Sequence, residues 1–284
     1  MRGLLIVVLA AGAWAQPATP VFPADNEKPK EGGAAELLEA VCPGKVVIGK
    51  EVTCGDVCPE FTSSPGHRED WHVASIIHGH FLSPISDDAA LAVLGCESHA
   101  LNFRGTVLLT RHFKKWQMVW YRSGVDTEEC HKRILEDSRE ILVCLDWYGA
   151  QGYTPTALFV QDLLSPTENL GGAFFRVVDD TFTCWSIVED DTKADPLRFQ
   201  HIERVSFGVQ RRDKTVLSVI AHYGERAMTP ADVKLCEQER DFSPNGSTSF
   251  KPLTKRYVVD FLFDGHDYHV APWSPKVEEG AASH

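Results

Sequence analysis

The chain has 284 residues, of which 40 are acidic and 28 are basic, and its formal net charge is −12. A chain with this charge repels phosphate backbones, and no stripe of Lys or Arg reverses the charge locally, so nucleic acid is not an expected partner. A hydrophobic content of 43% is ordinary for a folded domain.

The first residues predict export. Residues 1–15 have a positive start at Arg2, an apolar run and a small-x-small cleavage site, which together are typical of a signal peptide. The apolar run is too short for a stable membrane-spanning helix, and no later segment is apolar enough to form one. We therefore expect a secreted or periplasmic protein, with a composition that fits an exported bacterial protein, and no membrane span.

Both flanks of the predicted domain are polar. Residues 16–35 and 274–284 are rich in Pro, Gly and charged residues, and they contain few apolar side chains. Such segments bury too little surface to offset their ordering entropy, so we predict a flexible arm and a disordered tail. One domain is then expected over residues 36–273.

Within residues 36–273 the recurring pattern is the β-hairpin. Runs rich in β-branched and aromatic residues alternate with short polar turns, and the strongest turn signal is Asp264-Gly265. The clearest predicted strand pairs are 106–112 with 115–122, 204–210 with 215–222, and 256–263 with 266–272. Helices are expected only at 34–41 and 229–239, the second beginning with Thr229 and Pro230. The sequence predicts an all-β domain of antiparallel hairpins, either propeller-like or a sandwich, with two short helices.

Eight cysteines in a chain predicted to be exported favour disulfides over free thiols or zinc. Residues 130–144 fold naturally into a hairpin about Asp137, which places Cys130 opposite Cys144 and predicts a bridge between them. Cys236, on the second predicted helix, is expected to bridge to a strand, with Cys184 as the predicted partner.

The segment IIHGHFLSPISDDAAL, residues 76–91, admits two interpretations. In a strand, His78 and His80 point to the same side and could share a metal ion, with Asp88 as a further ligand. Alternatively, the segment is a strand, a proline-containing loop and a second strand, with both imidazoles in solvent.

Residues 79–93 resemble the FG-GAP repeats of integrin-type β-propellers. Gly79, Phe81, Asp88 and the apolar strand from residue 90 match the repeat. His80 replaces the first acidic ligand of the repeat's calcium loop, and Leu82 and Pro84 occupy two further ligand positions. The resemblance therefore implies a blade-like hairpin without the calcium ligands.

Two further groups of residues are candidates for function. Trp147, Tyr148 and Tyr153 lie in a glycine-containing segment that cannot easily bury three aromatic rings, which predicts a recognition surface. Paired carboxylates at 87–88, 179–180 and 189–191 could serve a glycosidase if two of them faced each other across a cleft.

The usual nucleophile, zinc-protease and phosphate-loop motifs are not found in the sequence. We therefore expect a disulfide-stabilised binding or scaffold protein that is not an enzyme, needs no cofactor, and recognises a protein or a carbohydrate. A hydrolase of glycans or envelope polymers that uses paired loop carboxylates is the first alternative. A metal-binding protein using His78 and His80 is the second.

Overall fold

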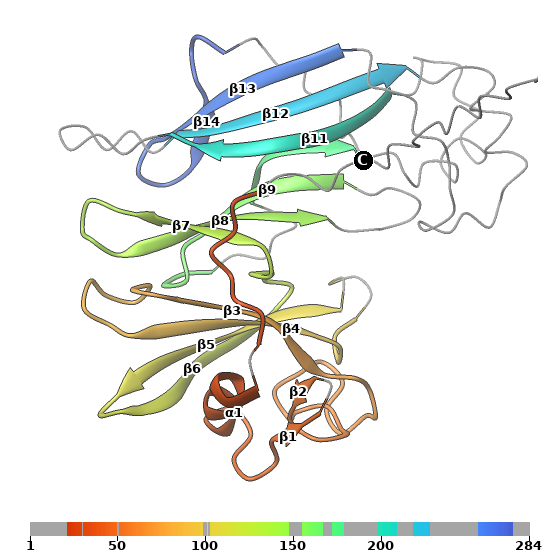
Figure 1. Cartoon of the computed structure of the whole chain (residues 1–284), viewed down its shortest axis with the longest axis vertical. Helices are drawn as coiled ribbons and strands as arrows, with labels where there is room; N and C mark the ends of the chain where they lie inside the picture. The colour runs from red at the N-terminus through yellow and green to blue at the C-terminus, as the bar shows by residue number, and fades with distance from the viewer. Residues whose placement is uncertain are drawn as a thin grey trace, which may run out of the picture.

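The computed structural model is mostly β and describes ten segments of the chain (Figure 1). They are residues 22–29, 31–49, 51–98, 101, 103–147, 155–166, 172–178, 198–208, 218–227 and 255–274. The predicted signal peptide, the helix at 229–239, and Cys184 and Cys236 lie outside these segments. Most of the predicted C-terminal tail lies outside them as well.

The described segments form three antiparallel sheets in chain order, and each sheet is a meander in which successive strands pair. Because sequential pairing needs only short connections, this topology agrees with the predicted hairpins. The first sheet contains β1 (Val47–Ile48), β2 (Val52–Thr53), β3 (His72–Gly79), β4 (Asp88–Leu94), β5 (Arg104–His112) and β6 (Lys115–Ser123). The second contains β7 (Cys130–Ile134), β8 (Glu140–Trp147), β9 (Pro155–Gln161) and β10 (Ala173–Val178). The third contains β11 (Arg198–Phe207), β12 (Ser218–Ala227), β13 (Lys255–Phe263) and β14 (Tyr268–Val270).

The sheets form three stacked layers, with the second sheet in the middle (Figure 1). Alternate residues of β8 point to opposite faces, as the pleat requires. Leu142 and Cys144 pack in a cluster shared with the first sheet, whereas Val143 and Leu145 pack against the third sheet. The middle sheet is therefore buried on both faces.

One helix, α1 (Glu31–Glu39), covers the outer face of the first sheet (Figure 1). Leu37 and Leu38 are buried there among residues of β3, β4 and β5. The helix begins three residues before the predicted start and ends two before the predicted end. Two glycines at positions 32 and 33 weakened the sequence signal, but packing of the apolar face decides the helix limits.

Three disulfides join described cysteines. Cys130 and Cys144 are bridged across β7 and β8, where they are direct register partners, which confirms that prediction. The remaining bridges, Cys42–Cys54 and Cys58–Cys96, tie α1 and the irregular segment after β2 to the first sheet. Disulfides of this kind are typical of oxidising compartments. Within the described segments, no helix is long and apolar enough to cross a membrane.

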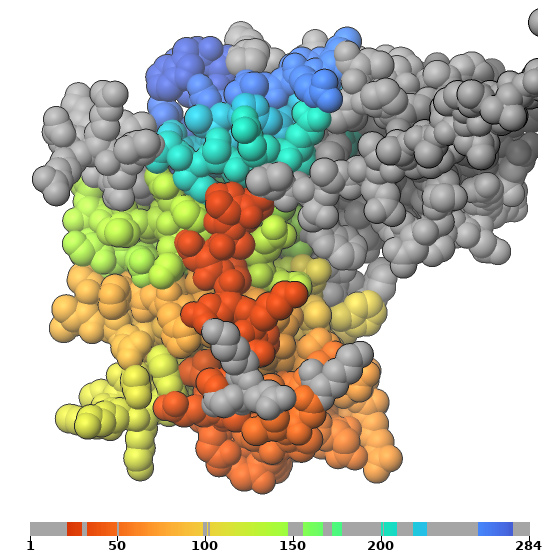
Figure 2. Space-filling model, viewed as in Figure 1, coloured from red at the N-terminus to blue at the C-terminus, as the bar shows by residue number. Residues whose placement is uncertain are grey.

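Residues 22–29, which fall inside the predicted arm, cross the edges of all three layers (Figures 1 and 2). We call this segment the strap. Phe22 packs edge-on against Phe207 of the third sheet, Asp25 donates its backbone N–H to the carbonyl of Cys130 in the second, and Glu27 exchanges backbone hydrogen bonds with Ile76 in the first.

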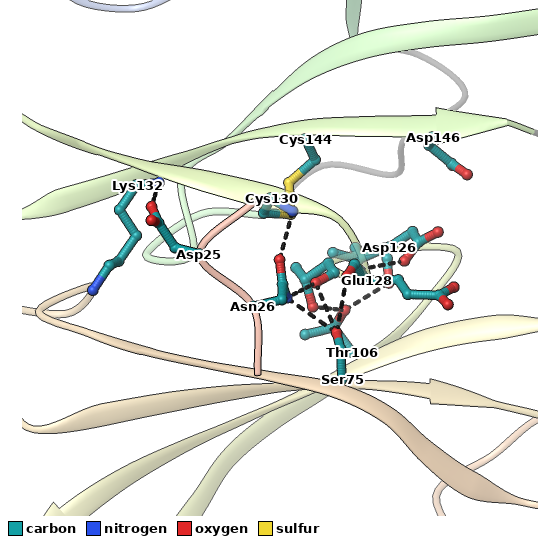
Figure 3. Close-up of a disulfide and its surroundings, with 12 residues drawn as sticks. Asp25, Asn26, Ser75, Thr106, Asp126, Glu128, Cys130, Lys132, Cys144 and Asp146 are labelled. Atoms are coloured by element: carbon teal, nitrogen blue, oxygen red, sulfur yellow. Dashed lines mark hydrogen bonds between the residues drawn. A yellow bond between two sulfur atoms is a disulfide. The ribbon is translucent and has the colours of Figure 1, made fainter. Parts of the chain in front are cut away.

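Asn26 links the strap to both the first and the second sheet through its side-chain amide (Figure 3). Its Oδ1 accepts from the Cys130 N–H at 2.6 Å, and its Nδ2 donates to the Thr127 carbonyl at 2.7 Å and to Ser75 Oγ at 3.0 Å. An amide supplies both a donor and an acceptor, whereas a carboxylate only accepts.

We predict that Asn26→Asp lowers the free energy of unfolding by about 1–3 kcal/mol, because two donated bonds are lost and a carboxylate then faces the Thr127 carbonyl. Equilibrium denaturation in urea measures the change. Asp25→Asn is the matched control, because its amide oxygen can still accept from the Lys132 N–H, as Asp25 does now. Equal losses in the two variants would contradict this role for Asn26.

Candidate functional site

His78 and His80 are both exposed, and their rings contact different partners. The ring of His78 lies 5.9 Å from that of Trp116, on the face of the first sheet that carries α1. His80 follows the end of β3, and its ring nitrogen Nδ1 contacts the Ser86 carbonyl. The two imidazoles therefore serve separate local structures.

Asp88 is fully buried at the start of β4, and it organises the preceding loop. Its Oδ2 accepts the backbone N–H groups of Phe81 and Leu82 at 2.8 and 2.9 Å, and the Ser86 hydroxyl at 2.5 Å. Its Oδ1 has no hydrogen-bond partner. The residue predicted as a metal ligand is thus the internal acceptor that fixes loop 80–87.

The structure does not gather His78, His80 and Asp88 into a metal site. Among the described residues, the one trio of ligand atoms close enough to hold an ion is Cys58, Glu69 and Cys96. Cys58 and Cys96 are joined in a disulfide, so neither offers a thiolate ligand. Glu69 instead accepts the Cys96 N–H at 3.0 Å.

The other predicted site residues fall at or beyond the limits of the described segments. Trp147 ends β8, and Tyr148 and Tyr153 lie outside the described residues, so the aromatic recognition surface stays a prediction. The carboxylates at 179–180 and 189–191 also lie outside them. Asp87 and Asp88 do not form a pair across a cleft, since Asp88 is buried in its loop and Asp87 extends to Arg111 at 3.5 Å.

A pocket of about 290 Å³ lies between the strap, α1 and the first sheet. Trp116 of β6 and Ile76 and Leu37 give it apolar walls. Its polar lining comes from four elements, so folding alone assembles it. These polar residues are Glu27, Lys28, Glu36, His78 and Arg111.

Arg111 links the pocket wall to the loop before β4. Its guanidinium lies 5.5 Å from the centroid of the Trp116 ring, in a cation–π contact. It also lies 3.9 Å from a carboxylate oxygen of Glu36 and 3.5 Å from one of Asp87. The cation–π contact orients the indole of Trp116. Around this one aromatic side chain, the pocket carries positively charged donors and carboxylate acceptors in similar number.

The sequence pattern singles out His78 but not the residues that surround it in the pocket. Trp116 is the second residue of an edge strand in which exposed and half-buried residues largely alternate, and Arg111 precedes a basic turn. Those patterns identify a strand and a turn. They do not show that an N-terminal helix and strap close over them.

A second polar cluster lies between the first two sheets, close to the Cys130–Cys144 bridge (Figure 3). Arg104 contacts Asp126, lies 3.0 Å from Asp146, and lies 3.5 Å from Glu128. Burial lowers the pKa of Arg104, but the three carboxylates raise it by a larger amount, so the net shift is upward. The cluster is an ion-pair network that holds two layers together.

Carboxylates at the margin of this network are held at raised pKa. Burial raises the pKa of Glu128 and outweighs the attraction of Arg104. Burial also raises the pKa of Glu129, and the neighbouring charges of Glu128 and Asp126 raise it further. The folded protein therefore favours the protonated form of both residues more than the unfolded chain does.

No family model matches the chain, and no match is found among the curated proteins or among the solved structures. The geometry of the described residues is thus the basis for inferring what the protein does.

We predict that Glu129→Gln stabilises the protein at pH 7 but not at pH 3. A raised folded-state pKa gives a stability contribution that is full below the ordinary value of 4.5 and is lost as pH rises through the folded value. An amide at this position does not ionise, so the variant keeps its stability as the pH rises. Denaturant midpoints at the two pH values measure the difference, and an equal effect of the substitution at both would contradict the prediction.

Proposed function

We propose that this protein is an exported, disulfide-stabilised binding protein that holds a carbohydrate in the pocket beneath α1. The observation that carries the proposal is the convergence of Trp116, His78 and Arg111 with Glu27 and Glu36 in one cavity. A signal peptide over residues 1–15 and a secreted or periplasmic location belong to the same proposal, and the three disulfides support them.

The chemistry of the lining favours a polyhydroxylated ligand. Sugar hydroxyls both donate and accept, so they match a wall that carries two carboxylates, two cations and an imidazole. The apolar faces of a sugar ring can pack against an indole. A cavity of about 290 Å³ is at the lower end of ligand-pocket sizes, which fits one or two sugar rings.

The chain order of the sheets bears on the proposed architecture. Successive meanders stacked in chain order resemble propeller blades more than a two-sheet sandwich. We therefore propose a propeller-like arrangement, with the FG-GAP-like segment at 79–93 forming one hairpin of the first sheet.

Binding of the purified protein to a printed array of neutral, amino and acidic glycans tests the proposed function, followed by calorimetry with the best glycan. Trp116→Ala is expected to weaken binding about tenfold or more, because it removes the aromatic wall. Trp273→Ala is the matched control. Trp273 follows β14, the last strand of the third sheet, is 67% exposed, and does not line the pocket.

Two results would contradict the pocket assignment. One is an array on which no glycan is retained. The other is binding that survives Trp116→Ala but is lost when Trp147, Tyr148 and Tyr153 are replaced together by Ala. That outcome would assign the carbohydrate site to the aromatic segment after β8 instead.

A further inference from the structure

The two most exposed large apolar side chains among the described residues lie at one end of the first sheet. Ile85, in the loop between β3 and β4, is 92% exposed, and Phe113, in the turn between β5 and β6, is 88% exposed. The two connections are neighbours, because Asp88 pairs with Thr110 across β4 and β5, and the Arg111 N–H donates to the Asp87 carbonyl at 2.7 Å.

Both side chains are held on ordered turns. The buried carboxylate of Asp88 fixes the loop that carries Ile85, through the bonds to Phe81, Leu82 and Ser86 described above. The turn that carries Phe113 has only two residues, because His112 and Lys115 are register partners. The β5–β6 hairpin stands clear of the body in the space-filling view (Figure 2).

The two-residue turn has an unfavourable sequence for its backbone. Phe113 and Lys114 have φ values of 46° and 66°, the left-handed region that hairpins of this kind usually fill with Asn and Gly. A bulky aromatic residue there costs stability, and in this structure it gains no burial in return. A partner outside the chain would bury this ring and offset the cost of the strained turn.

The same end is basic, although the chain as a whole is acidic. Arg111, His112, Lys114 and Lys115 surround Phe113. Arg111 is approached by Asp87 and Glu36, whereas neither lysine forms an ion pair with a described residue. The local charge therefore suits an anionic surface.

We propose that this end of the first sheet docks on an anionic lipid surface. Ile85 and Phe113 enter the boundary between headgroups and acyl chains, and Lys114 and Lys115 lie against the headgroups. Two separate apolar points on convex turns suit a deformable interface, whereas a protein partner would need two matching recesses. The proposal is independent of the carbohydrate pocket.

Co-sedimentation with vesicles tests the proposal directly. The full chain is expected to bind phosphatidylcholine vesicles that contain about one third phosphatidylglycerol, to bind pure phosphatidylcholine vesicles weakly, and to be released by added salt. Lys114→Gln with Lys115→Gln should weaken binding about twenty-fivefold, at about fivefold per basic residue. Phe113→Ser and Ile85→Ser should each weaken it about fivefold.

Matched controls separate local from general effects. Lys45→Gln with Arg68→Gln removes the same charge from exposed positions elsewhere, and Val270→Ser removes an exposed apolar side chain from the third sheet. These variants should lose less than about twofold. Phe113→Asn with Lys114→Gly relieves the backbone strain, so it should raise the melting temperature while weakening vesicle binding. A higher melting temperature together with weaker vesicle binding would show that unfolding does not cause the weaker binding.

Three outcomes would overturn the proposal. The first is equal binding to neutral and anionic vesicles, and the second is binding that the tip variants leave unchanged. The third is binding of a soluble polyanion such as heparin as tightly as anionic vesicles, without any loss in Phe113→Ser. That last result would assign the basic turn to a polyanion and not to a bilayer.

Discussion

The rest of the structure depends on a middle sheet that is buried on both faces. A sheet with two buried faces cannot alternate between apolar and polar residues, and β8 accordingly supplies a continuous run from Ile141 to Leu145 with no polar residue in it. The bridge from Cys130 to Cys144 faces the first sheet and adds a covalent link within this layer. Both outer sheets pack on the middle sheet, so their packing depends on that sheet being folded.

Stacking three sheets leaves the polar backbone groups along their edges to be satisfied. The strap does this for part of the stack, since its backbone and the Asn26 amide pair with groups from the first and second sheets. The network around Arg104 joins the same two layers with ion pairs instead of apolar contacts. Burial raises the pKa of Glu128 and Glu129 there, so the stability of the junction between these layers depends on pH.

The features proposed to bind ligands lie where rigid strands support short connections. His78 and Arg111 lie near the ends of their strands, at the same end of the first sheet as the turns that carry Ile85 and Phe113. The pocket and the exposed tips are thus neighbours that use different residues, Arg111 being the group between them. A protein bound to a lipid surface through the tips would keep its pocket close to that surface, which suits recognition of a carbohydrate presented there.

The sequence by itself determined the local structure. Period-two patterns and turn residues identified the antiparallel hairpins, and the symmetry of residues 130–144 about Asp137 identified one disulfide, because these are short-range constraints. Two histidines spaced two residues apart suggested a metal site, but the Asp88 side chain turns inward to cap its own loop, and the two imidazoles contact different partners. The stacking order of the sheets, the closure of α1 over Trp116, and the meeting of Ile85 with Phe113 at one end were decided only by the tertiary structure. They depend on contacts between segments far apart in the chain, which local periodicity does not encode.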